Sequence, residues 1–404
     1  MNEPHLTFVE EARTHRGLAL LLAALATVSP FSIDTFFPSF PAIAAQFGLN
    51  AWQMQQTLTA YLVPFALMSL VLGPLSDALG RRPIVLVGLS IYTLASIACA
   101  AAPSFAWLLS FRVVQGMSAG VGMAVGRAIV RDLHEGPEAQ RLLSTVTMIF
   151  GVAPAIAPVV GGWIHVAFGW RSVFLFMVCI GVALLIASYL QLPETHPEER
   201  RVPLHPASLA RTAWRIASHH EFILLALAGG ATICAMMIYL GAAPAIVLGH
   251  WHLTPTQFAW LFAPIIAGFV FGAWLSGRLA GRIPGGRQVA IGYAVSFGSG
   301  ALGLALHATV GRLPIAVQEV LIGVDAVGVQ LVTPILVLRM LDLFPKSRGS
   351  AASVQSCVML LTGSACIGLI VPALAGSLLF LGAGSLVATL LGFGLWSAAR
   401  PLTH

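Results

Sequence analysis

The sequence predicts an all-α polytopic membrane protein, and three observations carry this prediction. Hydrophobic residues make up 58% of the 404 residues and charged residues only 9%, against the roughly 25% charged residues of soluble domains. The mean hydropathy is +0.89. Uncharged runs extend over 35–76, 222–277 and 349–399, and each is long enough for two helices of the roughly 20 residues that cross a bilayer. A soluble globular protein is therefore excluded.

The hydropathy places twelve spanning helices along the chain. The first six are expected over 17–39, 53–73, 83–101, 105–127, 142–165 and 171–192. The second six are expected over 220–247, 255–277, 288–308, 313–338, 349–371 and 377–399. The 40 glycines and 24 prolines are compatible with these helices. In a bilayer, neighbouring helices re-satisfy freed backbone groups, and small residues permit close packing.

The turns between the helices indicate two halves. Short, Gly-rich, basic turns begin at Gly73, after the second helix, and at Gly277, after the eighth. The longest charged segment follows the sixth helix. We therefore expect an N-terminal six-helix bundle at 1–192, a cytoplasmic linker at 193–219 and a C-terminal six-helix bundle at 220–404. Repeated halves that meet near the bilayer midplane are typical of secondary transporters.

The basic residues predict the orientation in the membrane. If both termini are cytoplasmic, 18 of the 21 Lys and Arg residues lie in inner segments, whereas Arg171 and Arg312 lie outside and Arg112 lies within a span. Short cytoplasmic loops of membrane proteins carry an excess of Lys and Arg. We therefore expect cytoplasmic termini and an even number of spans.

Several classes of function are excluded. The net charge is +6, but the basic residues are scattered singly and in pairs, so we expect no nucleic-acid partner. The five cysteines lie in apolar segments without a C-x-x-C pair, which predicts neither disulfides nor a metal site. The helices lack the constellations of an intramembrane enzyme, and Lys346 is not in a Walker A loop. We expect no enzyme and no cofactor; a passive channel remains an alternative to a transporter.

Four charged residues fall inside predicted spans: Asp34 in the first helix, Arg112 in the fourth, and Glu319 and Asp325 in the tenth. A charge at a helix centre costs about 2.5 to 3.5 kcal/mol, so these residues must be paired, hydrated or protonated. Asp34 and Arg112 both lie roughly 10 Å below the outer surface, which allows an ion pair. Asp325 could face this pair across a central cavity. The alternatives are a purely structural ion pair or, for Glu319 near a helix end, snorkelling to the surface.

The predicted fifth helix carries the run GVAPAIAPVVGG, from Gly151 to Gly162. Pro154, Pro158 and Gly162 share one face at i+4 spacing, and Gly161 belongs to the adjacent ridge of small residues. Small residues let helix backbones approach closely, and the two prolines favour a bend. Ordinary small-residue packing is the alternative to a functional role.

Three segments resemble signatures of the major facilitator superfamily. The turn GPLSDALGRRP matches its cytoplasmic signature at Gly73, Asp77, Gly80, Arg81 and Arg82, with Ala78 where the family usually has a basic residue. The fourth helix matches the R-x-x-Q-G signature at Arg112, Gln115 and Gly116. The fifth-helix run resembles the signature of antiporting exporters at Pro158, Gly161 and Gly162, with Ala153 and Ala157 in place of glycine.

Within the superfamily, the chain resembles the Bcr/CflA drug-resistance subfamily, which includes phenicol exporters. The specific feature is the D-x-x-x-P-x-x-P run of Asp34, Pro38 and Pro41. The GAAPAIVLGH end of the seventh helix and the FPKSRGSAAS segment before the eleventh also agree. The resemblance covers nearly the whole chain and implies the major facilitator fold.

The resemblance also assigns roles to the cytoplasmic charges. It implies that Asp77, Arg81 and Asp132 form a charge relay that locks the two halves together when the cavity opens outward. An Asp is stabilised by the free N–H groups of a helix N-terminus, such as the start of the eleventh helix. The alternative is that Arg81 and Arg82 merely anchor the topology.

The leading hypothesis is a proton-coupled exporter of small amphipathic drugs that works by alternating access. We expect the proton-coupling residues to be Asp34, Arg112, Gln115, Asp325 and Glu319. We expect the drug to contact Asp34, Phe37, Tyr61 and Tyr239, although lipid-facing or packing roles are alternatives for the three aromatic residues. The alternative function is export of a sugar or other metabolite, because fold and motif do not determine the substrate. The expected partners are a small-molecule drug, protons and lipid, with a monomer in the bacterial inner membrane.

Overall fold

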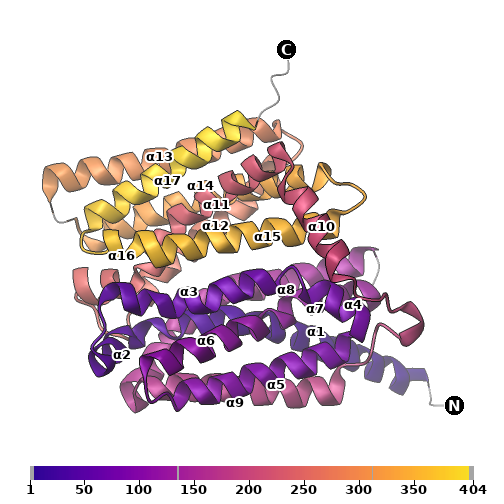
Figure 1. The fold of residues 1–404 in the computed structure, drawn as a ribbon. Helices are drawn as coiled ribbons and strands as arrows, with labels where there is room; N and C mark the ends of the chain where they lie inside the picture. Colours follow the sequence, from indigo (N-terminus) through magenta and orange to yellow (C-terminus); the bar gives the residue numbers. More distant parts are fainter. Residues whose placement is uncertain (1–3, 134–135, 312, 400–404) are drawn as a thin grey trace.

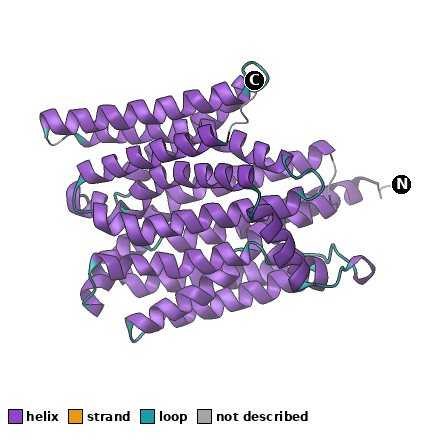
Figure 2. Ribbon diagram, turned by 45° about the horizontal axis from the view of Figure 1, so that its top comes forward, coloured by secondary structure: helices purple, strands orange, loops and turns teal. Residues whose placement is uncertain are grey.

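The computed structural model describes residues 4–133, 136–311 and 313–399, and these residues form helices, turns and loops without a β-strand. The long helices run side by side, with the loops at their two ends (Figure 2). We call one end the linker end, because α4 (Leu72–Leu79) and α10 (Pro206–Ala217) lie there, on the right of Figure 1. The opposite end, with α2 (Phe40–Phe47) and α16 (Val371–Leu374), is called the far end.

In the described residues before 192, the chain forms nine α-helices and one short 3-10 helix. The long helices are α1 (Pro4–Asp34), α3 (Ala51–Met68), α5 (Arg81–Ala100), α6 (Phe105–Ala119), α7 (Val121–Leu133), α8 (Gly136–Phe168) and α9 (Trp170–Gln191). The short ones are η1 (Phe37–Ser39), α2 (Phe40–Phe47) and α4 (Leu72–Leu79).

The rest of the chain begins with a short 3-10 turn, η2 (Glu198–Arg200), and the amphipathic helix α10 (Pro206–Ala217). The long helices that follow are α11 (His220–Gly241), α12 (Ala259–Leu279), α13 (Gly285–Val310), α14 (Ile315–Asp342), α15 (Arg348–Ala365) and α17 (Leu378–Ala398). Two π-helical turns, η3 (Ala245–His250) and η4 (Cys366–Ile370), and the single turn α16 (Val371–Leu374) complete the set.

The prediction of an all-helical polytopic chain is confirmed. Within the described residues, eleven helical stretches are long and apolar enough to cross a membrane, and α3 with α4 makes a twelfth if this pair, bent by 51°, is one span. The predicted second helix, 53–73, therefore ends early, at Met68. The predicted seventh helix is also shorter than expected, because α11 ends at Gly241 and a π-helical turn follows.

The first spanning segment breaks in its middle. α1 ends at Asp34, and the chain continues through η1 into α2, so that this segment extends from Gly17 to Phe47 and not to residue 39. Proline has no N–H to donate and its ring clashes with the carbonyl four residues earlier. If α1 continued beyond Asp34, the ring of Pro38 would clash with the Asp34 carbonyl, so the α-helix ends there. The D-x-x-x-P pattern places a carboxylate at the last residue of a helix inside the membrane.

The helices before α10 pack mainly against one another, and so do those after it. α5 packs against α6 and α9, and α1 against α7, α8 and α9. α14 packs against α11, α12 and α13. Figure 1 shows the indigo and purple helices below the orange and yellow ones. The two sets meet where α3 packs against α15 and η4, and where α8 packs against α12.

Candidate transport site

Arg112 is the most completely buried charge of the described chain, with no exposed surface. Its Nη1 donates hydrogen bonds to Gln115 Oε1 at 2.7 Å and to the Ser32 carbonyl at 3.2 Å. Its Nε donates to the Thr57 carbonyl at 3.3 Å. The guanidinium is thus held by α1, α3 and its own helix, α6. As the i+3 spacing predicts, Gln115 shares the face of Arg112.

Aromatic rings and hydroxyls complete the surroundings of this guanidinium. Its central carbon lies 4.4 Å from the ring centre of Tyr61 and 5.2 Å from that of Phe36, within the range of cation–π attraction. The Tyr61 hydroxyl is hydrogen-bonded to Ser29 at 3.1 Å. The Ser32 hydroxyl is hydrogen-bonded to the hydroxyl of Tyr92 at 2.5 Å. Tyr61, for which the sequence predicted only a contact with the drug, is fully buried and packs against the Arg112 guanidinium.

Asp34 does not form the expected ion pair with Arg112 in this structure. The Asp34 residue is 9% exposed, and no hydrogen bond or ion pair with a described residue reaches its carboxylate. On the other side, Arg112 Nη2 is buried without a hydrogen-bond partner. The helix break at Pro38 accounts for the arrangement: α1 offers Arg112 the Ser32 carbonyl, while Asp34 lies at the end of the helix. A buried carboxylate, that of Asp34, and a buried N–H donor without an acceptor, Arg112 Nη2, therefore both lie near this break.

We expect Arg112→Lys to lower stability and to impair transport, because a lysine cannot reproduce the planar set of donors. Losing one or two hydrogen bonds from a charged group to buried acceptors costs about 2 to 5 kcal/mol. The measurement is the free energy of unfolding in detergent, with transport in vesicles alongside. Arg171→Lys is the matched control, since Arg171 also contacts an amide and a carbonyl, at 3.0 Å each, but at the exposed far end. Equal behaviour of the two variants would contradict a special role for Arg112.

The other expected drug contacts lie in two separate places. Phe37 is buried at the far end, where its ring centre lies 5.6 Å from that of Phe40 and 6.1 Å from that of Phe262 in α12. Tyr239 lies in α11 and lines a cavity between α11, α13, α14 and α17. Phe37 and Tyr61 do not line the cavity of Tyr239.

The two acids of α14 also differ in their surroundings. Asp325 is 5% exposed and shares the cavity of Tyr239; its Oδ2 accepts a hydrogen bond from Ser385 at 3.4 Å, and its Oδ1 has no partner. It therefore faces a cavity within the second set of helices and not the Arg112 cluster. Glu319 is half-buried, has one buried oxygen without a hydrogen-bond partner, and does not line this cavity.

The glycines of the α8 run lie at two close contacts between backbones. A Cβ on Gly161 would lie 2.0 Å from the Thr35 carbonyl oxygen, at the break in the first segment. A Cβ on Gly162 would lie 1.9 Å from the Pro255 carbonyl oxygen, in the turn before α12. Gly151 has open space around it, and α8 remains one helix through Pro154 and Pro158.

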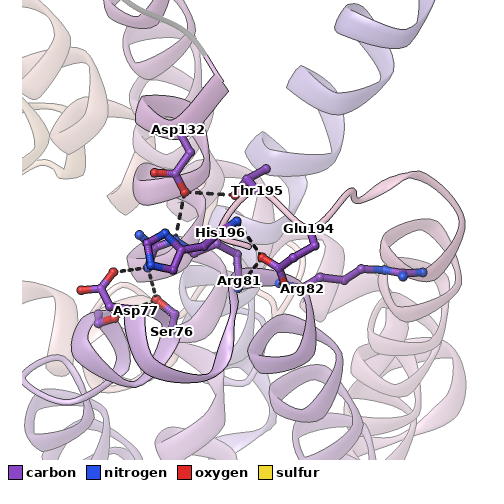
Figure 3. A network of polar contacts seen from close by, with 9 residues as sticks. Ser76, Asp77, Arg81, Arg82, Asp132, Glu194, Thr195 and His196 are labelled. Atoms are coloured by element: carbon purple, nitrogen blue, oxygen red, sulfur yellow. Dashed lines mark hydrogen bonds and ion pairs between the residues drawn. The ribbon is translucent and has the colours of Figure 1, made fainter. Parts of the chain in front are cut away.

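The signature between Gly73 and Arg82 forms a polar cluster at the linker end (Figure 3). Arg81 forms an ion pair with Asp77, and its Nη1 also donates to Ser76 Oγ at 2.6 Å. Its Nε donates to Asp132 Oδ2 at 3.0 Å, so that one arginine joins α4, α5 and α7. Asp77 keeps 47% of its side-chain surface exposed. We call Asp77, Arg81 and Asp132 the charge cluster.

The segment after α9 adds hydrogen bonds to this cluster, and the sequence did not predict them. Glu194 accepts hydrogen bonds from the backbone N–H groups of Arg81 at 3.0 Å and Arg82 at 3.3 Å, and Thr195 donates to Asp132 at 3.0 Å. Such contacts follow from the free N–H groups at the start of α5, but the sequence alone does not place the segment there.

Two other residues of the signature have local structural roles. Arg82 donates to the Tyr189 carbonyl at 2.7 Å and does not join the two aspartates. Gly80 has a φ of 99°, where other residues are strained, and a Cβ there would lie 2.5 Å from Glu194 Oε2. Gly73 has open space around it.

The family model of the Major Facilitator Superfamily matches residues 22–368. The chain therefore belongs to this superfamily of membrane transporters. Over 99% of the chain, the fold is similar to that of a bacterial homologue of the human lysosomal transporter Spinster, with a TM-score of 0.69 at 17% identity and 97% of that chain covered.

Curated relatives agree with the Bcr/CflA resemblance. An uncharacterised transporter of this superfamily, YdgK from Bacillus subtilis (strain 168), is 31% identical over 86% of the chain and 87% of its own length. A bicyclomycin resistance protein homologue from Haemophilus influenzae is 27% identical over 74% of the chain and 73% of its own length. Multidrug resistance protein D from Escherichia coli (strain K12) is 31% identical over 65% of the chain and 66% of its own length.

Proposed function

We propose that this protein exports small amphipathic drugs from the bacterial cytoplasm in exchange for protons. The observation that carries the proposal is the buried Asp34 carboxylate, which lies at a helix break and has no ion-pair partner among the described residues. A carboxylate at this depth is costly unless it is protonated or paired. Relatives named for resistance to bicyclomycin and to several drugs support the substrate class.

Proton coupling follows from two alternative states of the Asp34 side chain. When Asp34 is protonated it is neutral and tolerates its present position. When it loses the proton to the cytoplasm, the charge is stabilised by moving toward Arg112, whose Nη2 is free of hydrogen bonds. Binding of a drug beside Asp34 favours one of these states over the other, and a ligand shifts an equilibrium only through such a difference.

Alternating access requires two bodies that rock against each other. We assign these bodies to the six-helix bundles 1–192 and 220–404, joined by the linker 193–219, with both termini and the linker end on the cytoplasmic side. The basic residues support this orientation. We further propose that the protein acts as a monomer in the inner membrane.

The contacts between these bodies indicate closure at the far end. Gln55 donates to the Gly241 carbonyl at 2.8 Å, and Gln56 donates to the Gly368 carbonyl at 3.3 Å. The Phe37–Phe262 ring contact and the Gly162–Pro255 approach lie at the same end. At the linker end, Leu70 contacts the apolar core of the second body, but no described ion pair joins the charge cluster to α15.

The function is tested by drug susceptibility in a host that lacks its own drug pumps. Expression of the protein is expected to raise the inhibitory concentration of neutral or cationic amphipathic drugs and to lower their accumulation in the cell. An uncoupler that collapses the proton gradient should abolish the difference in accumulation. Unchanged accumulation across a broad drug panel, together with proton-dependent export of a sugar or other metabolite, would contradict the drug assignment.

Asp77→Asn is expected to shift the protein toward the state that is open at the linker end. Ser347 at the start of α15 makes no side-chain cap, so the N–H groups there are available to Asp77 when that end closes. Losing about 1 to 2 kcal/mol of this contact changes the population by roughly 5- to 30-fold. The measurement is a set of spin-label distances across the linker end.

The control for this variant is Glu198→Gln, which removes an acid that is 84% exposed in the linker. We expect its distance distribution to match that of the unmodified protein. An unchanged distribution in Asp77→Asn, accompanied by lost drug binding, would make Asp77 a structural support of the site and not a gate.

A further inference from the structure

The second set of helices encloses a cavity that the proposed drug cycle does not use. It has a volume of about 50 Å³ and lies between α11, α13, α14 and α17. Its polar lining consists of Asp325, Tyr239, Ser299, His307 and Gln318. The rest of the lining is formed by three glycines, Gly300, Gly303 and Gly382, and by apolar Ile and Leu side chains.

This cavity adjoins a larger hollow at the far end. The second hollow has a volume of about 420 Å³ and is lined by His250, Trp251 and His252 from the segment after α11, among others. His307 and Gln318 line both spaces. Gln318 is held in place, because its Oε1 accepts from Trp251 Nε1 at 2.9 Å and its Nε2 donates to the Leu313 carbonyl at 2.8 Å.

Two polar atoms of the cavity lining lack partners. Asp325 Oδ1 is buried without a hydrogen bond, and so is His307 Nε2. His307 Nδ1 lies 2.9 Å from the Gly303 carbonyl oxygen, which can only accept, so Nδ1 carries the hydrogen. In the neutral imidazole, Nε2 is therefore an acceptor that can take up a proton. His307 lies near the end of α13, whereas Asp325 lies ten residues into α14, roughly 15 Å along the helix.

The size of the cavity decides what can occupy it. A water molecule needs about 10 to 15 Å³ of such volume, whereas sites for drug-sized ligands measure roughly 300 to 1,000 Å³. A cavity of about 50 Å³ holds a few water molecules and no drug. The unpartnered Oδ1 and Nε2 atoms supply the polar contacts that such waters require.

We propose that this cavity is a water-filled proton pathway from the far-end hollow, past His307, to Asp325. A proton from the outer solution binds to His307 Nε2, passes along the waters and forms the O–H bond of the Asp325 carboxyl; it leaves by the same steps in reverse. The direction rests on the proposed function, which places the far end outside. The pathway makes Asp325 a second proton site, separate from Asp34.

The groups that face Asp325 are compatible with proton storage. α11 contributes Tyr239, α13 contributes Ser296 and Ser299, and α17 contributes Ser385. His307 lines the same cavity, but roughly 15 Å further along α13. α12 and α15, which also pack on α14, place no titratable side chain in the lining described. None of these groups is a permanent cation that could pair with Asp325. The negative charge of its carboxylate is therefore neutralised by binding a proton.

The test is infrared spectroscopy of the reconstituted protein in an Asp34→Asn background, following the protonated-carboxyl band after a rapid pH jump. We expect a band that titrates in Asp34→Asn, shifts in frequency when Asp325→Glu is added, and disappears when Asp325→Asn is added.

His307→Phe removes the relay, and Gly303→Leu fills the cavity while leaving the imidazole in the chain. Each should slow the appearance of the band by about 100-fold, the lower range for a positioned proton-transfer group.

Thr309→Phe is the matched control, because it adds the same ring to an exposed position on the last turn of α13. It should leave the rate unchanged. The pathway is overturned if no titrating band responds to Asp325→Glu, or if His307→Phe and Gly303→Leu both leave the rate as it is in Thr309→Phe. The infrared measurement needs neither drug nor transport. It can therefore contradict the proton pathway while the efflux assays support proton-driven drug export, or support the pathway while those assays contradict drug export.

Discussion

Asp34→Asn is expected to abolish proton-driven drug efflux while leaving a folded protein that still binds drug. Asparagine has nearly the same shape as aspartate but cannot carry or release the proton. The buried site then remains permanently neutral, which matches the protonated state and removes the alternative in which Asp34 moves to Arg112. One proton moving through about 100 mV supplies about 2.3 kcal/mol, and this driving force is lost.

Two transport assays distinguish the coupling of drug transport to protons from the movement of drug across the membrane. In vesicles, net uphill drug transport by Asp34→Asn should fall to the level of vesicles without the protein, whereas exchange of labelled for unlabelled drug should continue. Asp342→Asn is the control, since Asp342 is an exposed acid that pairs with Arg348 at 3.0 Å. Full uphill transport by a stably expressed Asp34→Asn protein would remove Asp34 from the coupling mechanism.

Gly162→Ala is expected to prevent closure at the far end and to reduce transport to near background. The added Cβ would lie 1.9 Å from the Pro255 carbonyl oxygen, so the backbones of α8 and of the turn before α12 must separate. Well-packed interfaces do not absorb such an overlap without a backbone shift, which costs typically about 1 to 3 kcal/mol and occasionally more. The contact belongs to the structure described, which we assign to the far-end-closed state, so the variant should favour a state in which the two backbones separate.

Gly151→Ala is the matched control, since it makes the same change on the same helix at a position with open space. Spin labels across the far end should report longer distances in Gly162→Ala and unchanged distances in Gly151→Ala. Normal transport by Gly162→Ala would show that the close approach of α8 to Pro255 is unimportant for the cycle.

The sequence predicts the helical architecture well because membrane spans and charged turns differ strongly in hydropathy. The resemblance to the superfamily also groups Asp77, Arg81 and Asp132, which the structure brings together although Asp132 is distant in the chain. Local backbone breaks are harder to predict. Pro38 and Pro41 indicate a functional motif, yet the direct effect of Pro38 is to end α1 at Asp34.

The surroundings of Arg112 could not be predicted in full. Two of its acceptors are the backbone carbonyls of Ser32 and Thr57, and a carbonyl carries no sequence signal. Equal depth in the membrane predicted a pairing with Asp34, but depth says nothing about the angle at which a side chain leaves its helix. The same limit explains Tyr239 and Asp325, which lie at suitable depths but face a cavity within their own set of helices.

The central claim is that drug export is driven by protons, and an imposed pH gradient in proteoliposomes tests it most directly. Purified protein is reconstituted with a fluorescent cationic drug outside and an acidic interior, and drug uptake and internal pH are recorded together. The account predicts that drug accumulates against its gradient only while the pH gradient lasts, that adding drug speeds the exit of protons, and that Asp34→Asn shows neither effect. Drug equilibration without accumulation, and with no drug-dependent proton movement in the unmodified protein, would contradict it.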